Sequence, residues 1–215
     1  MSSSTRLNQL FDQLDDWRHL PAYQLERRAD IFFSLYLPEV LFKTKSLGLA
    51  ETPILIPEFP CRLETVHATG GNQSFKVDYL AIAKASNSQP AQSVFVELKT
   101  EMGSRNDKQD ANLEAAQLKG MQALLKGISV IQDASKEKGK YQHLEGKLNN
   151  AAECADEITI VYVQPINSAN KSNVITFDEF ADVVEKHTDL LSLRFAKSLR
   201  EWARYEAGKP KTKNE

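Results

Sequence analysis

The stretch from Phe75 to Thr100 constrains the fold more than any other part of the sequence. It holds two segments rich in Val, Ile, Phe and Tyr, at 75–83 and 94–99, and a polar spacer that contains Pro90 separates them. Short apolar segments of this composition, bounded by turn residues, are typical of strands. The stretch therefore predicts two strands joined by a loop, each with side chains that alternate between two faces.

Three charged side chains lie on these predicted strands. Glu97 and Lys99 share one face of the second strand, and Asp78 lies within the apolar first strand. Such charges are costly to bury unless they are paired or bound to a metal. If the strands are neighbours, two carboxylates and one ammonium converge, and this combination suits a hard divalent cation and a phosphate. The alternative is a salt-bridged sheet surface, in which either acid pairs with Lys99 or with Lys76.

Length and composition predict an ordinary globular protein with a single domain over residues 1–215. The chain is long enough for one substantial core, and 26% of its residues are charged. No uninterrupted apolar run is long enough to cross a bilayer, and the N-terminus lacks the basic-then-apolar layout of a signal peptide. Cys61 and Cys154 form neither a CxxC motif nor a disulfide framework. These features predict a cytoplasmic protein whose two thiols are buried or idle.

Two helices are expected before the strand pair. Apolar residues at helical spacing predict a first helix within 1–20 and a second over 22–47. The second helix contains Pro38, which either kinks it or opens a new short helix. Glu39 follows among apolar side chains, so this acid lies either at a site or on a wet edge of the helix. Glu26 is the competing acid, although the two arginines after it favour a solvated face.

The segment between this helix and the strand pair is expected to be extended. Three prolines within 53–60 favour an extended edge or an irregular segment over a central strand. Residues 62–68 alternate as a strand, and the Gly-Gly-Asn sequence at 70–72 makes a turn, so a hairpin with the strand of Asp78 is predicted. Glu64 on this strand is a further candidate acid, with an ordinary surface position as the alternative.

One helix and one buried strand are expected after Lys99. The helix covers 107–126, and its inward stripe consists of Gln109, Leu113, Gln117, Met121 and Leu124. Gln117 is an amide among core positions, and it either hydrogen-bonds the backbone or points at the acids and Lys99. A polar, Lys-rich excursion with one short helical turn is expected over 132–157. A continuous apolar run at 158–163 is typical of a strand buried on both faces.

The C-terminal part is expected to be mainly helical. A weaker strand at 174–176 precedes a capping box of Thr176 and Glu179, which predicts a long helix over 177–207 and then a basic tail at 208–215. Four basic residues are expected on one stripe of this helix, namely Arg194, Lys197, Arg200 and Arg204. The stripe is either a solvated face or a set of phosphate contacts. Because the net charge is −2, any site for a polyanion must be local.

The charged residues carry a resemblance to a known family. Asp78, followed nineteen positions later by the Glu-Leu-Lys sequence at 97–99, resembles the motif of the PD-(D/E)XK phosphodiesterase superfamily, which includes restriction enzymes, resolvases and recombination exonucleases. Val77 stands where the motif has proline. The resemblance implies an α/β fold with a restriction-endonuclease-like αβββαβ core at about 24–164. In this fold a mixed central sheet is flanked by helices, and here extra helices would lie at both ends of the chain.

The same resemblance implies a metal site. Asp78 and Glu97 would hold Mg²⁺, or Mn²⁺ in its place, with the backbone carbonyl of Leu98 as a further ligand. Lys99 would orient or help to deprotonate the attacking water and would balance charge at the phosphate.

Many members add a glutamate from the first helix and a glutamine from the helix after the third strand. Glu39 and Gln117 match these positions, and Glu39 is favoured over Glu64. The chain is therefore expected to be a nuclease that hydrolyses phosphodiester bonds in DNA with Mg²⁺, with oligomers possible. The alternative is a non-catalytic nucleic-acid-binding or protein-interaction module that keeps the nuclease fold. The sequence contains no Gly-rich phosphate loop, GxSxG elbow or HExxH motif that would point to another chemistry.

Overall fold

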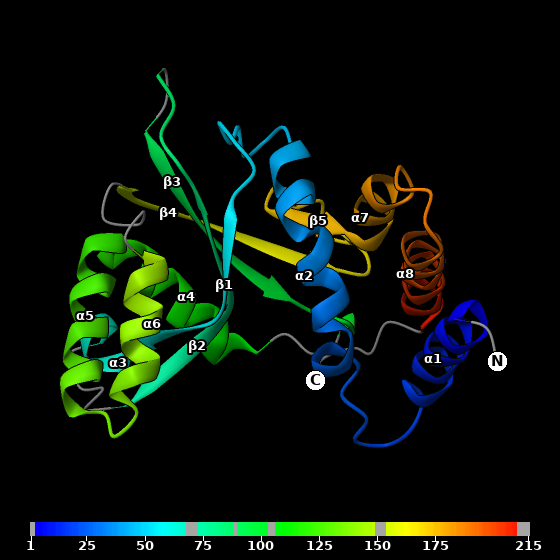
Figure 1. Ribbon diagram of the computed structural model, residues 1–215, viewed down its shortest axis with the longest axis horizontal. Helices are drawn as coiled ribbons and strands as arrows, with labels where there is room; N and C mark the ends of the chain where they lie inside the picture. Colours follow the sequence, from blue (N-terminus) through cyan, green and yellow to red (C-terminus); the bar gives the residue numbers. More distant parts are fainter. Residues whose placement is uncertain (1–2, 68–72, 88–89, 103–105, 149–153, 210–215) are drawn as a thin grey trace. The chain divides into compact units, whose positions relative to one another are not determined.

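The structure is a computed structural model that describes residues 3–67, 73–87, 90–102, 106–148 and 154–209. Its strands hydrogen-bond in the order β1-β2-β3-β4-β5 (Figure 1). They are β1 (Ile54–Arg62), β2 (Ser74–Ala83), β3 (Ala91–Leu98), β4 (Cys154–Gln164) and β5 (Val174–Thr176). The pairs β1–β2 and β2–β3 are antiparallel, and β4–β5 is parallel. The prediction of an α/β chain with a mixed sheet and flanking helices is confirmed.

The chain divides into two compact units, which are described one at a time. Unit 1 comprises residues 1–43, 98–104 and 162–215, and unit 2 comprises residues 44–97 and 105–161. The helices of unit 1 are α1 (Ser3–Trp17), α2 (Leu25–Lys43), α7 (Phe177–Val184) and α8 (Leu190–Gly208). The helices of unit 2 are α3 (Leu63–Val66), α4 (Asp107–Lys119), α5 (Met121–Ala134) and α6 (Lys138–Leu148).

In unit 2, strand β1 lies beside β2 at an edge of the strand order, as its prolines predict. Its alternation between faces shifts by one residue at Glu58, where φ is 51°. Ile56, Phe59 and Cys61 are consequently all buried. The Phe59 ring lies 5.9 Å from the ring of Phe95 on β3. The shift therefore turns Cys61 toward the face of the sheet that Phe95 occupies.

The prediction of a strand at 62–68 is wrong, because Leu63–Val66 form helix α3. Strand β1 already occupies the edge beside β2, and its last residue, Arg62, pairs with Ser74. The chain must therefore turn in the short space between the two strands, and α3 begins that turn. The turn expected at 70–72 lies outside the described residues.

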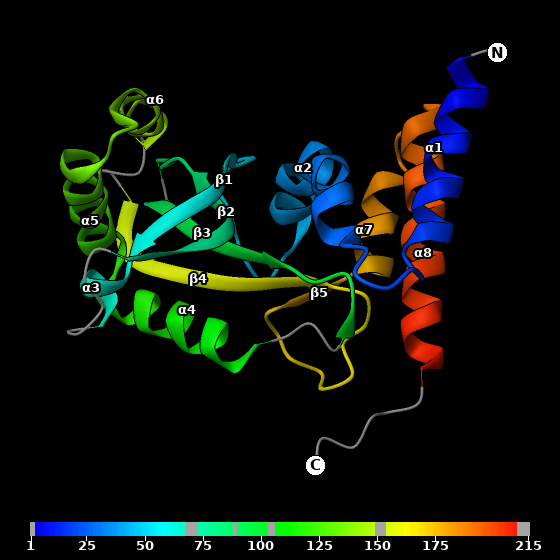
Figure 2. The same cartoon turned by 90° about the horizontal axis from the view of Figure 1, so that it is seen from below.

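The prediction of one helix over 107–126 is also wrong, because α4 ends at Lys119 and α5 begins at Met121. Gly120 between them has φ 81°, a conformation that residues with a Cβ rarely adopt. In place of the single short turn predicted within 132–157, α6 is a full helix. Figure 2 shows α4 lying along one face of the strands of unit 2.

The core of unit 1 is aromatic. Phe33 of α2 packs against Phe177, Phe180 and Phe195, with ring centroids 5.4, 5.2 and 5.2 Å away. Phe11 of α1 lies 6.1 Å from Phe195. All five rings are buried, so α1, α2, α7 and α8 share one apolar core.

The helix predicted over 177–207 is two helices. Thr176 and Glu179 form the predicted capping box at the start of α7, but α7 ends at Val184 and Asp189 caps a new helix, α8. Helix α2 continues through Pro38. Within the described part of the chain, no helix has the length and apolarity that a membrane crossing needs.

Candidate active site

The register of unit 2 brings Asp78 and Glu97 together. Tyr79 of β2 lies opposite Val96 of β3. Asp78 and Glu97 are the next residue on each of these neighbouring antiparallel strands. If the register continues by one residue they lie opposite each other, as in cross-strand pairs whose Cβ atoms are about 4.5–5.5 Å apart. The expectation that the two predicted strands are neighbours is confirmed.

The two carboxylates differ in burial. Glu97 is 0% exposed, whereas Asp78 is half-buried. A buried carboxylate requires hydrogen bonds to remain ionised at acceptable cost. Gln109 supplies one, because its Nε2 donates to Oε2 of Glu97 at 2.5 Å. Glu97 is therefore fully buried, whereas Asp78 lies at the edge of the buried region.

Helix α4 positions Gln109. Asn106 caps the helix by accepting a hydrogen bond from the backbone N–H of Lys108, which places Gln109 in the first helical turn. Leu113 and Ala116 are fully buried and anchor the helix on the strands. These side chains recur at the spacing of one helix face, so the packing of α4 directs the Gln109 amide at Glu97.

Cys61 of β1 is a further neighbour of Glu97. Burial raises the pKa of the Cys61 thiol well above its usual range, and the negative charge of Glu97 raises it further. The thiol is 1% exposed. It therefore stays protonated and forms a neutral part of the surroundings of Glu97, and the expectation of a buried thiol is confirmed for Cys61.

Lys99 belongs to unit 1 and is 5% exposed. It follows the last residue of β3, and its backbone N–H donates to the carbonyl of Val163 at 2.8 Å. It is also the second residue after Glu97 along the chain.

Glu39 is engaged within unit 1. Its carboxylate accepts hydrogen bonds from Lys43, one turn further along α2, and from Nε2 of His187 at 2.7 Å. The hydrogen bond from Lys43 is the main reason why the pKa of Glu39 lies below its usual value, and the bond from His187 adds to it. These contacts are those of an acid on the solvent-facing edge of α2, which was the alternative to a position at a site.

Gln117, two turns after Gln109 on α4, donates from Nε2 to the carbonyl of Ile158 on β4 at 2.6 Å. This contact is the backbone alternative that the sequence left open for Gln117. Glu64, the other candidate acid, is exposed and pairs with Arg62.

The basic residues of α8 differ in their contacts. Arg194 is buried and donates to two aspartates of α1 at 2.8 and 2.7 Å. Arg200 instead bonds acids of α7 and its C-terminus, namely Asp178, Asp182 and Glu185. Lys197 and Arg204 are exposed. Two of the four cations thus serve contacts between helices of unit 1.

The sequence did not single out Gln109 or Cys61 as neighbours of Glu97. Gln109 was visible as the first member of the predicted inward stripe of α4. Within the described residues, no group of three or more His, Cys, Asp and Glu side chains gathers as a metal centre. A site built from two carboxylates and a backbone carbonyl does not require such a group.

No family model, curated protein or solved structure matches the chain. The function is therefore argued from the residues of the site.

Proposed function

We propose that the chain is a nuclease that hydrolyses phosphodiester bonds in DNA with a divalent cation. The observation that carries the proposal is that Asp78 and Glu97 each adjoin the Tyr79–Val96 pair on neighbouring antiparallel strands. Lys99 follows two residues after Glu97, so one strand end supplies both an acid and a base. DNA as the substrate rests on the resemblance of this set to the PD-(D/E)XK motif.

The donor set fits a hard divalent cation. Two carboxylates side by side repel each other when both are ionised, and a cation between them relieves that repulsion. Carboxylate and carbonyl oxygens are the ligands that Mg²⁺ and Mn²⁺ prefer. Asp78 and Glu97 would hold the ion, together with the backbone carbonyl of Leu98. When bound, such an ion polarises a phosphoryl oxygen and lowers the pKa of a coordinated water.

The residues of the chain then have separate tasks. Lys99 would orient the attacking water, or help to take its proton, and its positive charge would offset the charge that builds up on the phosphate. Water forms a new bond to phosphorus while the bond from phosphorus to one ester oxygen breaks, and that oxygen takes up a proton. Gln109 would keep the Glu97 carboxylate in one orientation through its 2.5 Å hydrogen bond.

The order of elements supports the proposal. Helix α2, strands β1, β2 and β3, helix α4 and strand β4 follow one another in the αβββαβ order that the resemblance implies, with α3 added after β1 and α5 and α6 added after α4. The Asp78 strand is second and the Glu97 strand is third among the first three strands. The proposal rests on Asp78, Glu97 and Lys99, because Glu39 and Gln117 have the other contacts described above.

Incubation with plasmid and linear DNA, with Mg²⁺ or Mn²⁺ and with EDTA as control, tests this function. The wild-type chain is expected to cut DNA only with the divalent ion, and Asp78→Ala is expected to be inactive. Equal cutting by wild type and Asp78→Ala would show that a contaminant or another site is responsible. Salt-dependent DNA binding without cutting would instead support the non-catalytic alternative.

A protein-interaction module is a second candidate, and the outer face of α2 favours it. Ile31, Leu35 and Phe42 lie at helical spacing and are 61%, 57% and 42% exposed. Apolar side chains in such a row often mark a contact surface. Light scattering and a DNA titration distinguish the candidates, since an interaction module would associate through this face and would neither bind nor cut DNA.

A further inference from the structure

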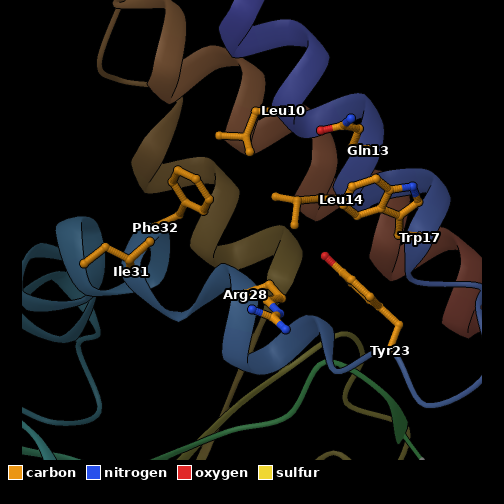
Figure 3. A pocket seen from close by; sticks show the side chains of 8 residues that line it. All are labelled: Leu10, Gln13, Leu14, Trp17, Tyr23, Arg28, Ile31 and Phe32. Atoms are coloured by element: carbon orange, nitrogen blue, oxygen red, sulfur yellow. The ribbon is translucent and has the colours of Figure 1, made fainter.

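A pocket of about 440 Å³ opens between α1 and the start of α2 in unit 1 (Figure 3). Leu14 of α1 and Phe32 of α2 form its apolar floor, and Trp17 and Tyr23 stand at one end. The two aromatic rings meet edge to face, with centroids 6.1 Å apart. Trp17 is 40% exposed, so a large part of its ring is available to a ligand.

Polar groups gather at the mouth of this pocket. Figure 3 shows the hydroxyl of Tyr23 and the guanidinium of Arg28 directed toward the space between the lining side chains, with the Gln13 amide on α1. Its volume falls within the range of about 300–1,000 Å³ that small-molecule sites occupy. Aromatic walls with one cation at the rim suit a flat ring that carries an anionic group.

The charges around the pocket allow an anion to approach. Asp12 and Asp15 of α1 are bonded by Arg194 on another side of the helix, which neutralises much of their charge. Asp16 is exposed next to Trp17 and opposes an anion. Arg28 therefore offsets a local negative charge, and stacking on the aromatic rings must provide most of the affinity.

The dimensions favour a base over a protein helix as the ligand. The lining residues of α1 extend from Leu10 to Trp17, which is about 10 Å along a helix. Only about two turns of a partner helix could pack against this length. A stable protein interface needs about 800 Å² from each partner, which is far more than such a contact provides.

We infer that this pocket binds one base of a single strand of DNA, with the ring against Trp17 or Tyr23 and the adjacent phosphate at Arg28. The inference rests on the proposed function and adds to it a preference for unpaired bases. A base within a duplex is stacked on both sides and cannot enter the pocket. Stacking on aromatic side chains binds single strands with little regard to sequence, because every base has a π-face.

Tryptophan fluorescence tests the site directly. The chain has two tryptophans, and Trp202 is 1% exposed, so an added oligonucleotide can reach only Trp17. A twelve-residue oligothymidylate is expected to quench the emission in EDTA, where no cleavage occurs. A blunt duplex of equal length is expected to leave it unchanged. No quenching at saturating oligothymidylate, or equal quenching by the duplex, overturns the inference.

Variants identify the contacts. Binding of the fluorescein-labelled oligothymidylate in EDTA is expected to weaken about ten-fold in Trp17→Ala and to be largely kept in Trp17→Phe. Arg28→Gln is expected to weaken binding, whereas the matched Arg6→Gln, an exposed arginine of α1 outside the pocket, is not. Thermal unfolding checks that each variant is folded. Equal affinities for Trp17→Ala, Arg28→Gln and Arg6→Gln contradict the site.

The outcomes separate this inference from the proposed nuclease. If the chain cuts DNA with a divalent ion but Trp17→Ala binds oligothymidylate as tightly as wild type does, the pocket is rejected and the nuclease is kept. Binding that requires Trp17 in a chain that never cuts rejects the nuclease and keeps the pocket. A change in Trp17 emission on concentrating the protein without DNA, together with a dimer in light scattering, rejects the base in favour of a second copy of the chain.

Discussion

Gln109 donates a hydrogen bond to Glu97 across 2.5 Å and so joins the first turn of α4 to the end of β3. Glu97 is fully buried, and a buried carboxylate with too few donors would take up a proton or destabilise the sheet. The amide supplies a donor without adding a charge. The hydrogen bond holds the carboxylate of Glu97 in one orientation.

Replacement of Gln109 is expected to impair cleavage more than stability. In Gln109→Ala the Glu97 carboxylate loses the hydrogen bond from Gln109 that helps to fix its orientation, and the rate of Mn²⁺-dependent DNA cutting should fall about 10- to 100-fold. The matched control is Gln117→Ala, two turns further along α4, which removes the bond to the carbonyl of Ile158. That variant should lose about 1 kcal/mol of stability and keep its cutting rate. Equal rates in the two variants would contradict a role for Gln109 at the site.

Arg194 is expected to stabilise the fold rather than to bind nucleic acid. Arg194→Gln leaves Asp15, which is 21% exposed, without its cation, and should lower the free energy of unfolding by about 2 kcal/mol. Lys197→Gln on the same helix is the control, because Lys197 is 65% exposed and its ion pair with Glu201 is long at 3.7 Å. Its effect should stay within about 0.5 kcal/mol. Urea unfolding measures both, and similar losses would show that Arg194 is not a structural cation.

Gly120 is expected to be indispensable at the junction of α4 and α5. Its φ of 81° and ψ of 162° fall in a region that only glycine occupies readily. A Cβ at this position would also overlap the carboxylate of Asp156, which accepts a hydrogen bond from the Gln122 N–H at 2.9 Å. Gly120→Ala should therefore cost about 2 kcal/mol or more of stability.

The control for this substitution is Gly139→Ala in α6. A Cβ at Gly139 would meet no described atom within 4 Å. Alanine favours a helix by up to about 1 kcal/mol over glycine, so this variant should be as stable as wild type or more so. Thermal unfolding compares the two. A neutral effect of Gly120→Ala would show that the junction can adopt another backbone conformation.

The contacts of Glu39 predict a dependence of stability on pH. Because Lys43 and His187 lower the pKa of Glu39 in the folded chain, its ionised form is favoured by folding. The resulting stabilisation is complete above its ordinary value of 4.5 and is lost as the pH falls through the lower folded value. The stability difference between wild type and Glu39→Gln should therefore be larger at neutral pH than in acid.

Unfolding by urea at neutral pH and at acid pH measures this difference. The same comparison in a Lys43→Gln background removes the main cause of the shift, so the change with pH should shrink. A stability difference that stays constant with pH would mean that the contacts of Glu39 do not persist in solution.

Much of the site was predictable from sequence because strand alternation is a local property. The composition of the two segments predicts β2 with Asp78 and β3 with Glu97, and the two strands are neighbours in the sheet. Contacts between segments far apart in the sequence were harder to predict. The family resemblance matched Gln117 to a position near the acids, whereas Gln109 contacts Glu97. Helix periodicity places both amides on one face and does not say which turn meets the strand end.

The effect of tertiary contacts on the structure of single segments was also not predicted from the sequence. The segment at 62–68 alternates like a strand, yet it forms α3 because β1 already occupies the edge beside β2. The partners of the basic residues on α8 were not predicted either, because acids on α1 bond Arg194 and acids on α7 bond Arg200. In both cases tertiary contacts decide the outcome, and a pattern in one segment does not contain them.

The most direct test of the account is the binding of Mn²⁺ measured by calorimetry in the absence of DNA. If Asp78 and Glu97 hold one ion, wild type should bind it, Asp78→Asn and Glu97→Gln should each lose most of the affinity, and the double variant should be no worse than either. Glu64→Gln, which removes an exposed acid of α3, should bind as wild type does. Wild-type protein that binds no Mn²⁺ at millimolar concentration, or variants that bind it as wild type does, would contradict the account.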